Sequence, residues 1–522
     1  MSVEKFKEQI QPAFSFTGKS IMLGGAVYDK QPVTGVSVSM PLSTVNRHGL
    51  IAGATGTGKT KTIQRLAEAL SEQGVNVLLM DIKGDISGIS KPGTQNEKII
   101  ERMKLIGSAW APCEYPTELM TISNEKGVRL RATVSEFGPV LFSKILELNE
   151  NQEGAVAIVF KYCDDKHLPL LDIKDFRAAL QHITDGAGKK EVEQNYGAVP
   201  SASASVIMRK LLELELQGGD KFFGEKSFEV EDLLQKDSYG KAYINILRLT
   251  DIQDRPKLFS TFMLCLLAEI YSKFPEIGDK KEPKLVIFID EAHLIFKEAS
   301  SALLQQIETI IKLIRSKGVG IYFCTQAPTD IPDIILSQLG SKIQHALRAF
   351  TAKDRKDIKL VAENFPITEF YDTDQLITEL GIGEALVTVL NEKGIPSPLV
   401  HTIMCAPQSR MDVLTPAEQD EKIASSKIAK EYNEEIDRES AYEILKGKVA
   451  QPTQPAEEPD RREMVDVGHK KEPSGGIGDT IMSFATSSVG KTVIKEVTRG
   501  LLGVLIGKPT RSSSRKRGGG FF

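Results

Sequence analysis

The chain has 522 residues, more than one hydrophobic core usually serves, so two or three domains are expected. A net charge of −4 excludes a generally basic, polyanion-binding composition, and any basic surface must therefore be local. Five widely spaced cysteines form no metal-binding pattern, and neither a signal peptide nor an apolar run of membrane-spanning length is evident, so we expect a cytoplasmic protein with free thiols.

The N-terminal residues 1–45 are expected to form a small β element. Residues 20–25 and 33–40 alternate between apolar and polar side chains like short strands, and Gly24-Gly25 and Pro32 supply turns. This element is expected to pack on the edge of a main domain whose first part spans residues 46–94.

A phosphate-binding loop follows. Residues 53–60 read GATGTGKT and match G-x-x-x-x-G-K-[ST] in full, between an apolar run and a helix-like segment. Loop N–H groups and the helix N-terminus bind phosphate oxygens. Lys59 is predicted to contact the β- and γ-phosphates, and the Thr60 hydroxyl to bind Mg²⁺. The predicted nucleotide-binding residues are Gly53, Ala54, Thr55, Gly56, Thr57, Gly58, Lys59, Thr60 and Lys61.

A second buried strand is predicted over residues 75–80, and it is followed by Asp81 and Asp85. Open α/β sheets place their chemistry at the carboxyl ends of strands. These aspartates either orient water or a neighbouring strand, or stabilise a turn, and the sequence favours neither interpretation.

Residues 95–240 are expected to form a mostly helical insertion, because helix-like stretches dominate and no catalytic constellation occurs there. The second part of the core is expected over residues 241–410. It contains an apolar strand, residues 284–289, that ends in Asp290 and Glu291. Asp290 is predicted to hold Mg²⁺ and Glu291 to polarise the attacking water, which favours hydrolysis over phosphoryl transfer to another substrate.

Another predicted strand ends at Gln326, whose amide can sense the γ-phosphate or hold the water. Arg315, Arg348 and Arg355 are each candidates for an arginine finger, which stabilises transition-state charge. For any single one of them, the sequence favours a surface residue over a finger. Residues 351–354 resemble a guanine-recognition motif only loosely, so ATP is the expected nucleotide.

The C-terminal part is expected to contain a charged helix over residues 411–448, beginning with a capping box at Thr415. A Pro/Glu-rich linker, residues 449–475, is predicted to be disordered. An amphipathic helix and a basic tail are predicted for residues 476–522. The helix docks on a neighbouring subunit, lies on a membrane or closes its own domain, and we favour docking; the tail contacts nucleic acid or only aids solubility.

These motifs resemble the HerA/FtsK group of pumping ATPases and, most closely, bacterial HerA-like proteins of the YjgR type. The resemblance extends over nearly the whole chain and is carried by residues 46–50 (NRHGL), 81–85 (DIKGD), 290–293 (DEAH), 325–328 (TQAP), 347–351 (LRAFT) and 499–503 (RGLLG). It implies an α/β fold with a RecA-like, mostly parallel sheet and an ATP- and Mg²⁺-dependent hydrolase.

The resemblance also implies partners. Such proteins form rings, commonly homo-hexamers, with the nucleotide between subunits and an arginine supplied by the neighbour; by matching position Arg315 is the first choice. DNA translocation or unwinding is the implied activity. HerA proper has a sizeable N-terminal barrel that docks a nuclease, whereas only about 45 residues precede the phosphate loop here, so a nuclease partner is not expected.

Two further functions stay open from the sequence. A nucleotide-dependent switch or scaffold would use the same phosphate loop, and so would a motor that acts on protein chains. Stimulation of ATP hydrolysis by DNA distinguishes the DNA helicase or translocase from both.

Overall fold

The computed structural model describes residues 2–450 except 253, 279–281, 298–300, 435 and 437. In this part of the chain twelve strands form one sheet, in the order β2-β1-β12-β11-β10-β3-β9-β8-β4-β7-β5-β6. Their bounds are β1 Ser20–Tyr28, β2 Gln31–Pro41, β3 Gly49–Ala52, β4 Asn76–Asp81, β5 Thr117–Thr121, β6 Val128–Arg129, β7 Ile244–Arg248, β8 Leu285–Ile289, β9 Val319–Thr325, β10 Ser341–Gln344, β11 Glu384–Thr388 and β12 Val400–Met404.

The strands from β10 to β6 run parallel, whereas β11, β12, β1 and β2 pair antiparallel at one side of the sheet. The phosphate-loop strand β3 lies between β10 and β9, and β9 separates it from β8. Because β3, β8, β9 and β10 are parallel, the loops after them meet at one edge, which we call the carboxyl edge. The predicted α/β fold with a mostly parallel sheet is confirmed.

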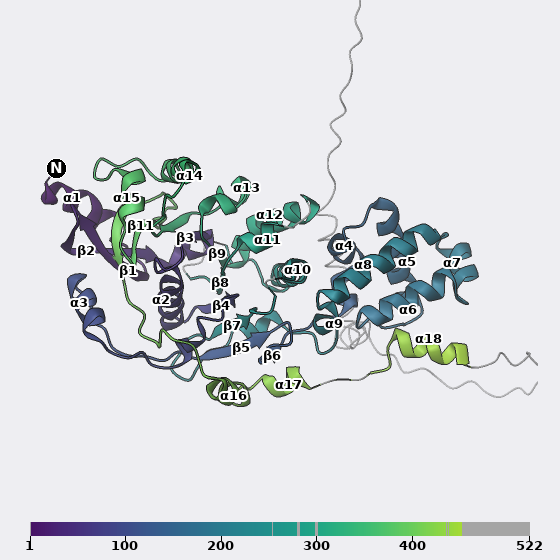
Figure 1. The fold of residues 1–522 in the computed structure, drawn as a ribbon. Helices are drawn as coiled ribbons and strands as arrows, with labels where there is room; N and C mark the ends of the chain where they lie inside the picture. The colour runs from purple at the N-terminus through teal and green to yellow at the C-terminus, as the bar shows by residue number, and fades with distance from the viewer. Residues whose placement is uncertain are drawn as a thin grey trace, which may run out of the picture.

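Helices cover both faces of the sheet (Figure 1). On one face lies α2 (Lys59–Glu72), whose residues Ile63, Leu66 and Leu70 are buried against Val77 and Leu79 of β4. On the other face lie α10 (Pro256–Lys273) and α12 (Ser301–Ile314), which share one hydrophobic core with Leu78 and Met80 of β4. Successive side chains of a strand point to opposite faces, so β4 contributes to both cores.

The N-terminal residues contain a helix that the sequence analysis did not predict, α1 (Val3–Ala13). Phe6 and Ile10 of α1 are buried, and the hairpin β1-β2 joins the main sheet through β12. Residues 1–45 are therefore a helix and two strands of the large sheet, and not a separate β element. The α1 pattern is short and contains Pro12, which hid it.

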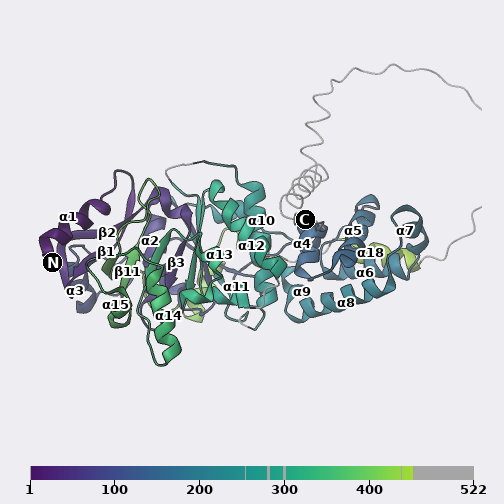
Figure 2. The ribbon, with the colours of Figure 1, turned by 90° about the horizontal axis from the view of Figure 1, so that it is seen from above.

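A helical unit forms one end of the elongated molecule (Figures 1 and 2). It comprises α4 Val134–Ile145, α5 Glu150–Asp165, α6 Ile173–Thr184, α7 Lys189–Asn195, α8 Ser201–Leu216 and α9 Gly219–Phe222. The predicted range of 95–240 was too wide, because it also holds α3 (Glu97–Leu105) and the sheet strands β5 and β6. β5 buries polar Thr117, Glu118 and Thr121, so its sequence lacks the apolar pattern of a strand.

The segment after β12 is not one helix. It contains α16 (Pro416–Ala424), α17 (Ala429–Asn433) and α18 (Ala441–Ala450), and it runs from the sheet to the helical unit, where α18 contacts α6. The predicted capping box at Thr415 is present, but α16 ends at Ser425, where the predicted charged helix 411–448 was expected to continue. The predictions for 451–522, namely most of the linker, the amphipathic helix and the basic tail, lie outside the described residues.

The remaining helices are short elements around the carboxyl edge and the antiparallel strands: α11 His293–Lys297, α13 Asp333–Leu336, α14 Ala352–Glu363 and α15 Thr373–Glu379. No helix in the described ranges combines the length and the apolar composition needed to cross a bilayer.

Candidate nucleotide-binding site

The phosphate loop joins β3 to α2 at the carboxyl edge. Gly53, Gly56 and Gly58 have φ angles of 153°, 77° and 114°, which side chains with a Cβ rarely adopt. The loop is attached to both neighbouring strands, because the Gly53 N–H donates to the Thr325 carbonyl (3.3 Å) and the Ala54 N–H donates to the Ala346 carbonyl (2.8 Å). The sequence thus yields a fixed loop whose following helix begins with free N–H groups.

Lys59 spans this loop. Its Nζ donates to the carbonyls of Gly53 (2.6 Å) and Ala54 (3.3 Å), and only 5 % of the residue is exposed. Burial lowers the pKa of the Lys59 ammonium, and the nearby Lys83 lowers it further. The hydrogen-bond acceptors of Lys59 are two carbonyls, and a phosphate group would add charged acceptors to them.

Oxygen atoms suited to a hard cation gather beside the loop. The Thr60 hydroxyl donates to Asp85 Oδ2 (3.2 Å), while Asp85 Oδ1 and Asp290 Oδ2 are buried atoms with no hydrogen-bond partner among the described residues. Burial raises the pKa of Asp290 to about 6. No group of three or more His, Cys, Asp or Glu able to hold a metal occurs in the described part of the chain.

This donor set fits Mg²⁺, which keeps several waters and commonly binds one or two carboxylates together with substrate phosphates. Thr60 and Asp290, the predicted ligands, lie where the carboxyl end of β8 and the start of α2 approach. Asp85 is an additional candidate ligand, for which the sequence alone favoured neither a site role nor a turn role.

Asp81 stabilises the turn that follows β4, which is the second of the two interpretations that the sequence allowed. Its carboxylate accepts the N–H groups of Gly84 (2.8 Å), Asp85 (3.2 Å) and Ile86 (3.3 Å), and so holds the loop that carries Asp85. Burial, followed by the repulsion from Asp85, raises the pKa of Asp81 to about 7.

Glu291 follows β8 with a φ of 46°, a left-handed conformation that is costly for a glutamate. The residue is 6 % exposed, its carboxylate forms an ion pair with Lys83, and His293 Nδ1 lies 3.3 Å from Oε2. Burial raises the pKa of Glu291, but Lys83, His293 and Lys59 together lower it more, so the net shift is downward. The carboxylate is therefore ionised and able to accept a proton from water.

Gln326 is exposed at the end of β9, next to the phosphate loop, because Thr325 is paired in register with Ala52. The turn after it is fixed by Asp330, whose Oδ2 accepts the Thr325 hydroxyl (2.6 Å) and the Ala327 N–H (3.0 Å). This turn lines one wall of an open cleft of about 600 Å³ that begins at His293.

Two buried histidines, which were not predicted from the sequence, connect the strands around the site to neighbouring elements through hydrogen bonds. His345 Nδ1–H donates to the Glu384 carbonyl (2.8 Å), so its Nε2 accepts the Thr62 hydroxyl (3.0 Å). At the opposite edge, His48 Nδ1 accepts the Ile321 N–H (3.0 Å), and Nε2 donates to the Ile311 carbonyl (3.0 Å). Burial lowers the pKa of each imidazole to about 4. For His48 the sequence signal was its position just before the predicted strand of the phosphate loop, whereas no strand was predicted beside His345.

The arginine candidates lie in different places. Arg315 follows α12 and precedes β9, so it lies at the edge opposite the phosphate loop, where its carbonyl accepts Asn46 Nδ2 (3.4 Å). Arg348 lies beyond β10 at the carboxyl edge, exposed, and donates to the Thr378 carbonyl (2.7 Å). Arg355 is exposed on α14. One subunit therefore does not bring Arg315 to its own Glu291.

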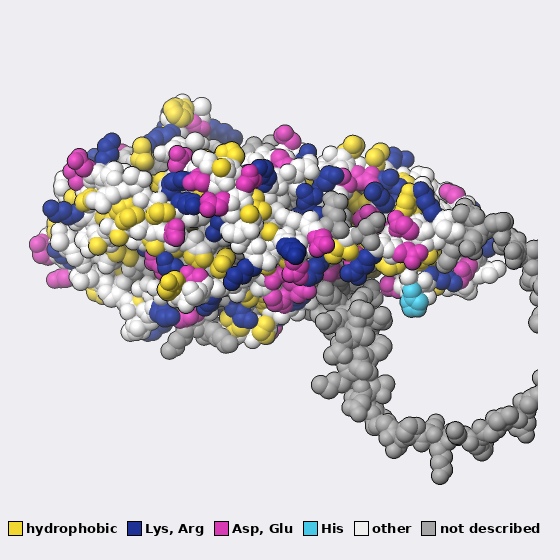
Figure 3. Space-filling view, turned by 90° about the horizontal axis from the view of Figure 1, so that it is seen from below, with side chains coloured by type: hydrophobic (Ala, Val, Ile, Leu, Met, Phe, Trp, Pro, Cys, Tyr) yellow, Lys and Arg dark blue, Asp and Glu magenta, His cyan; other side chains and the backbone are white. Residues whose placement is uncertain are grey.

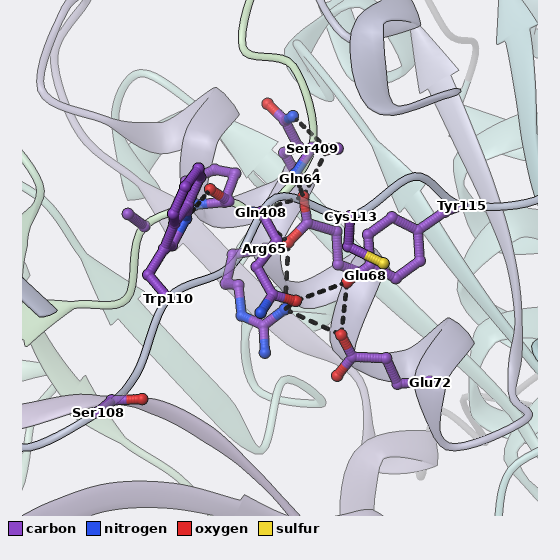
Figure 4. Close-up of polar contacts among 12 residues, drawn as sticks. Gln64, Arg65, Glu68, Glu72, Ser108, Trp110, Cys113, Tyr115, Gln408 and Ser409 are labelled. Atoms are coloured by element: carbon purple, nitrogen blue, oxygen red, sulfur yellow. Dashed lines mark hydrogen bonds and ion pairs between the residues drawn. The ribbon is translucent and has the colours of Figure 1, made fainter. Parts of the chain in front are cut away.

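The Lys61 side chain points away from the loop and donates from Nζ to the Met411 carbonyl (2.6 Å). Lys61 also donates to Gln64 Oε1 (3.4 Å), and Gln64 is part of a polar network along α2 that holds residues 408–410. Figure 4 shows this network around Gln64, Glu68 and Ser409. At its centre is Glu68, fully buried, which accepts the N–H groups of Gln408 and Ser409 and pairs with Arg65. The helix pattern placed Glu68 on the polar face, so this network could not be predicted.

The sheet, the phosphate loop and the two carboxylates after β8 define the P-loop nucleoside triphosphatase fold of the RecA-like class. A family model described as "Helicase HerA-like C-terminal" matches residues 28–511, and the chain belongs to this family, which confirms the resemblance to the HerA group.

Among curated relatives, the DNA double-strand break repair helicase HerA of Saccharolobus solfataricus is 23 % identical over 377 residues, which are 67 % of this chain and 63 % of that protein. The DNA import protein CedB of Sulfolobus acidocaldarius is 24 % identical over 400 residues, 76 % of this chain and 58 % of that protein. The chain thus spans less than two thirds of the length of these relatives.

Solved structures show the same fold. The plasmid coupling protein TrwB in complex with the ATP analogue ADPNP has a TM-score of 0.51 and 15 % identity, with 79 % of this chain and 96 % of that chain covered. The unbound monoclinic form of TrwBΔN70, a bacterial conjugative coupling protein, gives 0.50 and 13 %, with 80 % and 95 % covered.

Proposed function

We propose that this protein is a Mg²⁺-dependent ATPase that assembles into a ring and moves along or unwinds duplex DNA. The observation that carries the ATPase assignment is Glu291, an ionised and nearly buried carboxylate held beside the phosphate loop. The DNA assignment rests on the family and on the two relatives named above, a repair helicase and a DNA import protein.

The residues have separate tasks in this proposal. The loop N–H groups and Lys59 bind the β- and γ-phosphates, Glu291 takes the proton of the attacking water, and Gln326 orients that water or the γ-phosphate. Thr60 and Asp290, with Asp85 beside them, would hold Mg²⁺, which neutralises charge on the phosphates.

The arginine finger is proposed to come from a neighbouring subunit. Arg315 lies at the edge opposite its own phosphate loop, so it can act only in trans, whereas Arg348 lies at the same edge as that loop and is the alternative. A homo-hexamer is the proposed assembly.

DNA contact has to come from local surfaces. Basic and acidic side chains are interspersed over the face drawn in Figure 3, in keeping with the net charge of −4. The proposal is tested by measuring ATP hydrolysis by the full chain with and without duplex DNA, with EDTA as the Mg²⁺-free control. Hydrolysis that rises with DNA supports a DNA motor; ATP binding with no hydrolysis under either condition would instead indicate a nucleotide-dependent scaffold.

A further inference from the structure

A short loop of residues 381–383, Gly-Ile-Gly, lies against the phosphate loop just before β11. The Gly383 N–H donates to the Thr57 carbonyl (2.9 Å). A Cβ on Gly58 would come within 3.1 Å of Gly383 N and 3.2 Å of its Cα, so the two backbones are in direct contact. Ile382 lies between Gly381 and Gly383 and presents its side chain to solvent, with 73 % of the residue exposed.

The loop is fixed by charged groups around it. Arg102 of α3 donates to the carbonyls of Ile382 (2.8 Å) and Gly383 (3.0 Å). Glu384 accepts the Gly381 N–H (3.0 Å) and is itself bound by His401 (2.9 Å). Because the loop is held at both ends, the exposed Ile382 side chain is an apolar surface that is already in place. A ligand that binds there does not have to pay the entropy cost of ordering the loop.

The position of the loop relative to the catalytic groups indicates which part of a bound nucleotide would contact Ile382. Glu291 and Gln326 follow β8 and β9, on one side of β3, while the loop precedes β11, beyond β10 on the other side. A triphosphate whose γ-phosphate points toward Glu291 must direct its α-phosphate, and therefore its sugar and base, toward the β10-β11 side.

We propose that Ile382 is the platform on which the base of the bound nucleotide packs, with Arg102 as the positioning residue that holds the platform. The inference rests on the proposed function and adds a base-binding residue to it. The contact is between an aliphatic side chain and an aromatic face, so it lacks the directionality of hydrogen bonds and serves adenine and guanine alike.

The test compares three ligands that share a triphosphate, of which two carry a base and one does not. Equilibrium binding of ATP, GTP and inorganic tripolyphosphate is measured by calorimetry on the full chain with Mg²⁺. Ile382→Asp is expected to weaken ATP and GTP by about five- to tenfold, the effect of losing part of one buried aliphatic contact, and to leave tripolyphosphate within about twofold. Ile382→Leu should bind all three like the parent chain.

Ile367→Asp is the matched control, because Ile367 is fully exposed on another loop and should change none of the affinities. Arg102→Ala is expected to reproduce the ATP-selective loss, and Arg102→Lys to restore part of it. Unchanged ATP affinity in Ile382→Asp, or an equal loss for tripolyphosphate, would overturn the platform while leaving the ATPase proposal intact. If the parent chain binds neither ATP nor tripolyphosphate, the proposed function fails and this inference fails with it.

Discussion

Two buried carboxylates near helix α2 differ in how their oxygen atoms are used. Along the middle of α2, Glu68 is fully buried and accepts two backbone N–H groups and the Ser409 hydroxyl (2.5 Å), with Arg65 as its counter-ion. Near the first turn of α2, Asp290 is equally inaccessible but leaves Oδ2 without a hydrogen-bond partner among the described residues.

This difference in hydrogen bonding indicates that Glu68 serves stability and Asp290 serves function. A buried carboxylate with all its acceptor positions used fixes structure, here the attachment of residues 408–410 to the nucleotide-binding helix. Buried oxygen atoms without hydrogen-bond partners lower the free energy of unfolding. They are retained at sites where a bound ligand or ion supplies the missing interaction. The positive φ of Glu291 at the same edge is a second such cost. Substitutions of Glu68 should therefore reduce stability, whereas substitutions at the end of β8 should reduce activity.

The largest effect is expected at the proposed subunit interface. Arg315→Ala should lower ATP turnover on the order of 10³–10⁵-fold, because an arginine finger stabilises charge that develops only in the transition state, and ATP binding should be nearly unchanged. Turnover and equilibrium binding of ATP are measured on the same preparation.

Mixing supplies the sharper test. Rings assembled from Arg315→Ala and Glu291→Gln subunits contain some interfaces with an intact Glu291 and an intact neighbouring Arg315, so part of the activity should return. Absence of recovery despite demonstrated co-assembly would transfer the role to Arg348.

Glu291→Gln alone should reduce turnover by roughly 10²–10⁴-fold and keep ATP affinity, because the amide cannot take the proton of water. Lys59→Ala should instead lose ATP affinity, since its ammonium contacts the phosphates in the proposal. Thermal unfolding of both variants should match the parent chain. Near-normal hydrolysis by Glu291→Gln would contradict its assignment as the base.

The same comparison explains what the sequence could reveal. The phosphate loop and the strand before Asp290 are local patterns, in which spacing alone specifies a turn, a helix face or a buried strand. Glu68, His345 and the base platform depend on contacts between residues far apart in the chain, such as Glu68 with Ser409. Nothing in the periodicity of a helix shows that a glutamate on its polar face will be covered by a segment some 340 residues later.

Substitution of Glu68 should affect stability and not chemistry. Glu68→Ala removes one of the two carboxylates that pair with Arg65, the other being Glu72, and leaves the N–H groups of Gln408 and Ser409 without their acceptor. The expected loss is about 3 kcal/mol in the free energy of unfolding. Chemical denaturation measures this loss, and Glu101→Ala on the exposed surface of α3 is the control. At a temperature where the variant is folded, turnover per bound ATP should be normal; a fall comparable to that of Glu291→Gln would refute the division between the two regions.

The smallest effect is expected from a carboxylate between these extremes, Glu118 of β5, which is 4 % exposed. Burial raises its pKa to about 7, only partly opposed by a hydrogen bond from Ser426. Because the folded state holds this proton more tightly than the unfolded state, Glu118 contributes stability that is complete below the ordinary pKa of 4.5 and is lost as the pH rises through 7. From pH 5 to pH 8 the loss should be about 2 kcal/mol. Glu118→Gln does not titrate, so denaturation at the two pH values should show a correspondingly smaller decline, and an unchanged decline would mean that Glu118 is ionised in the folded protein throughout.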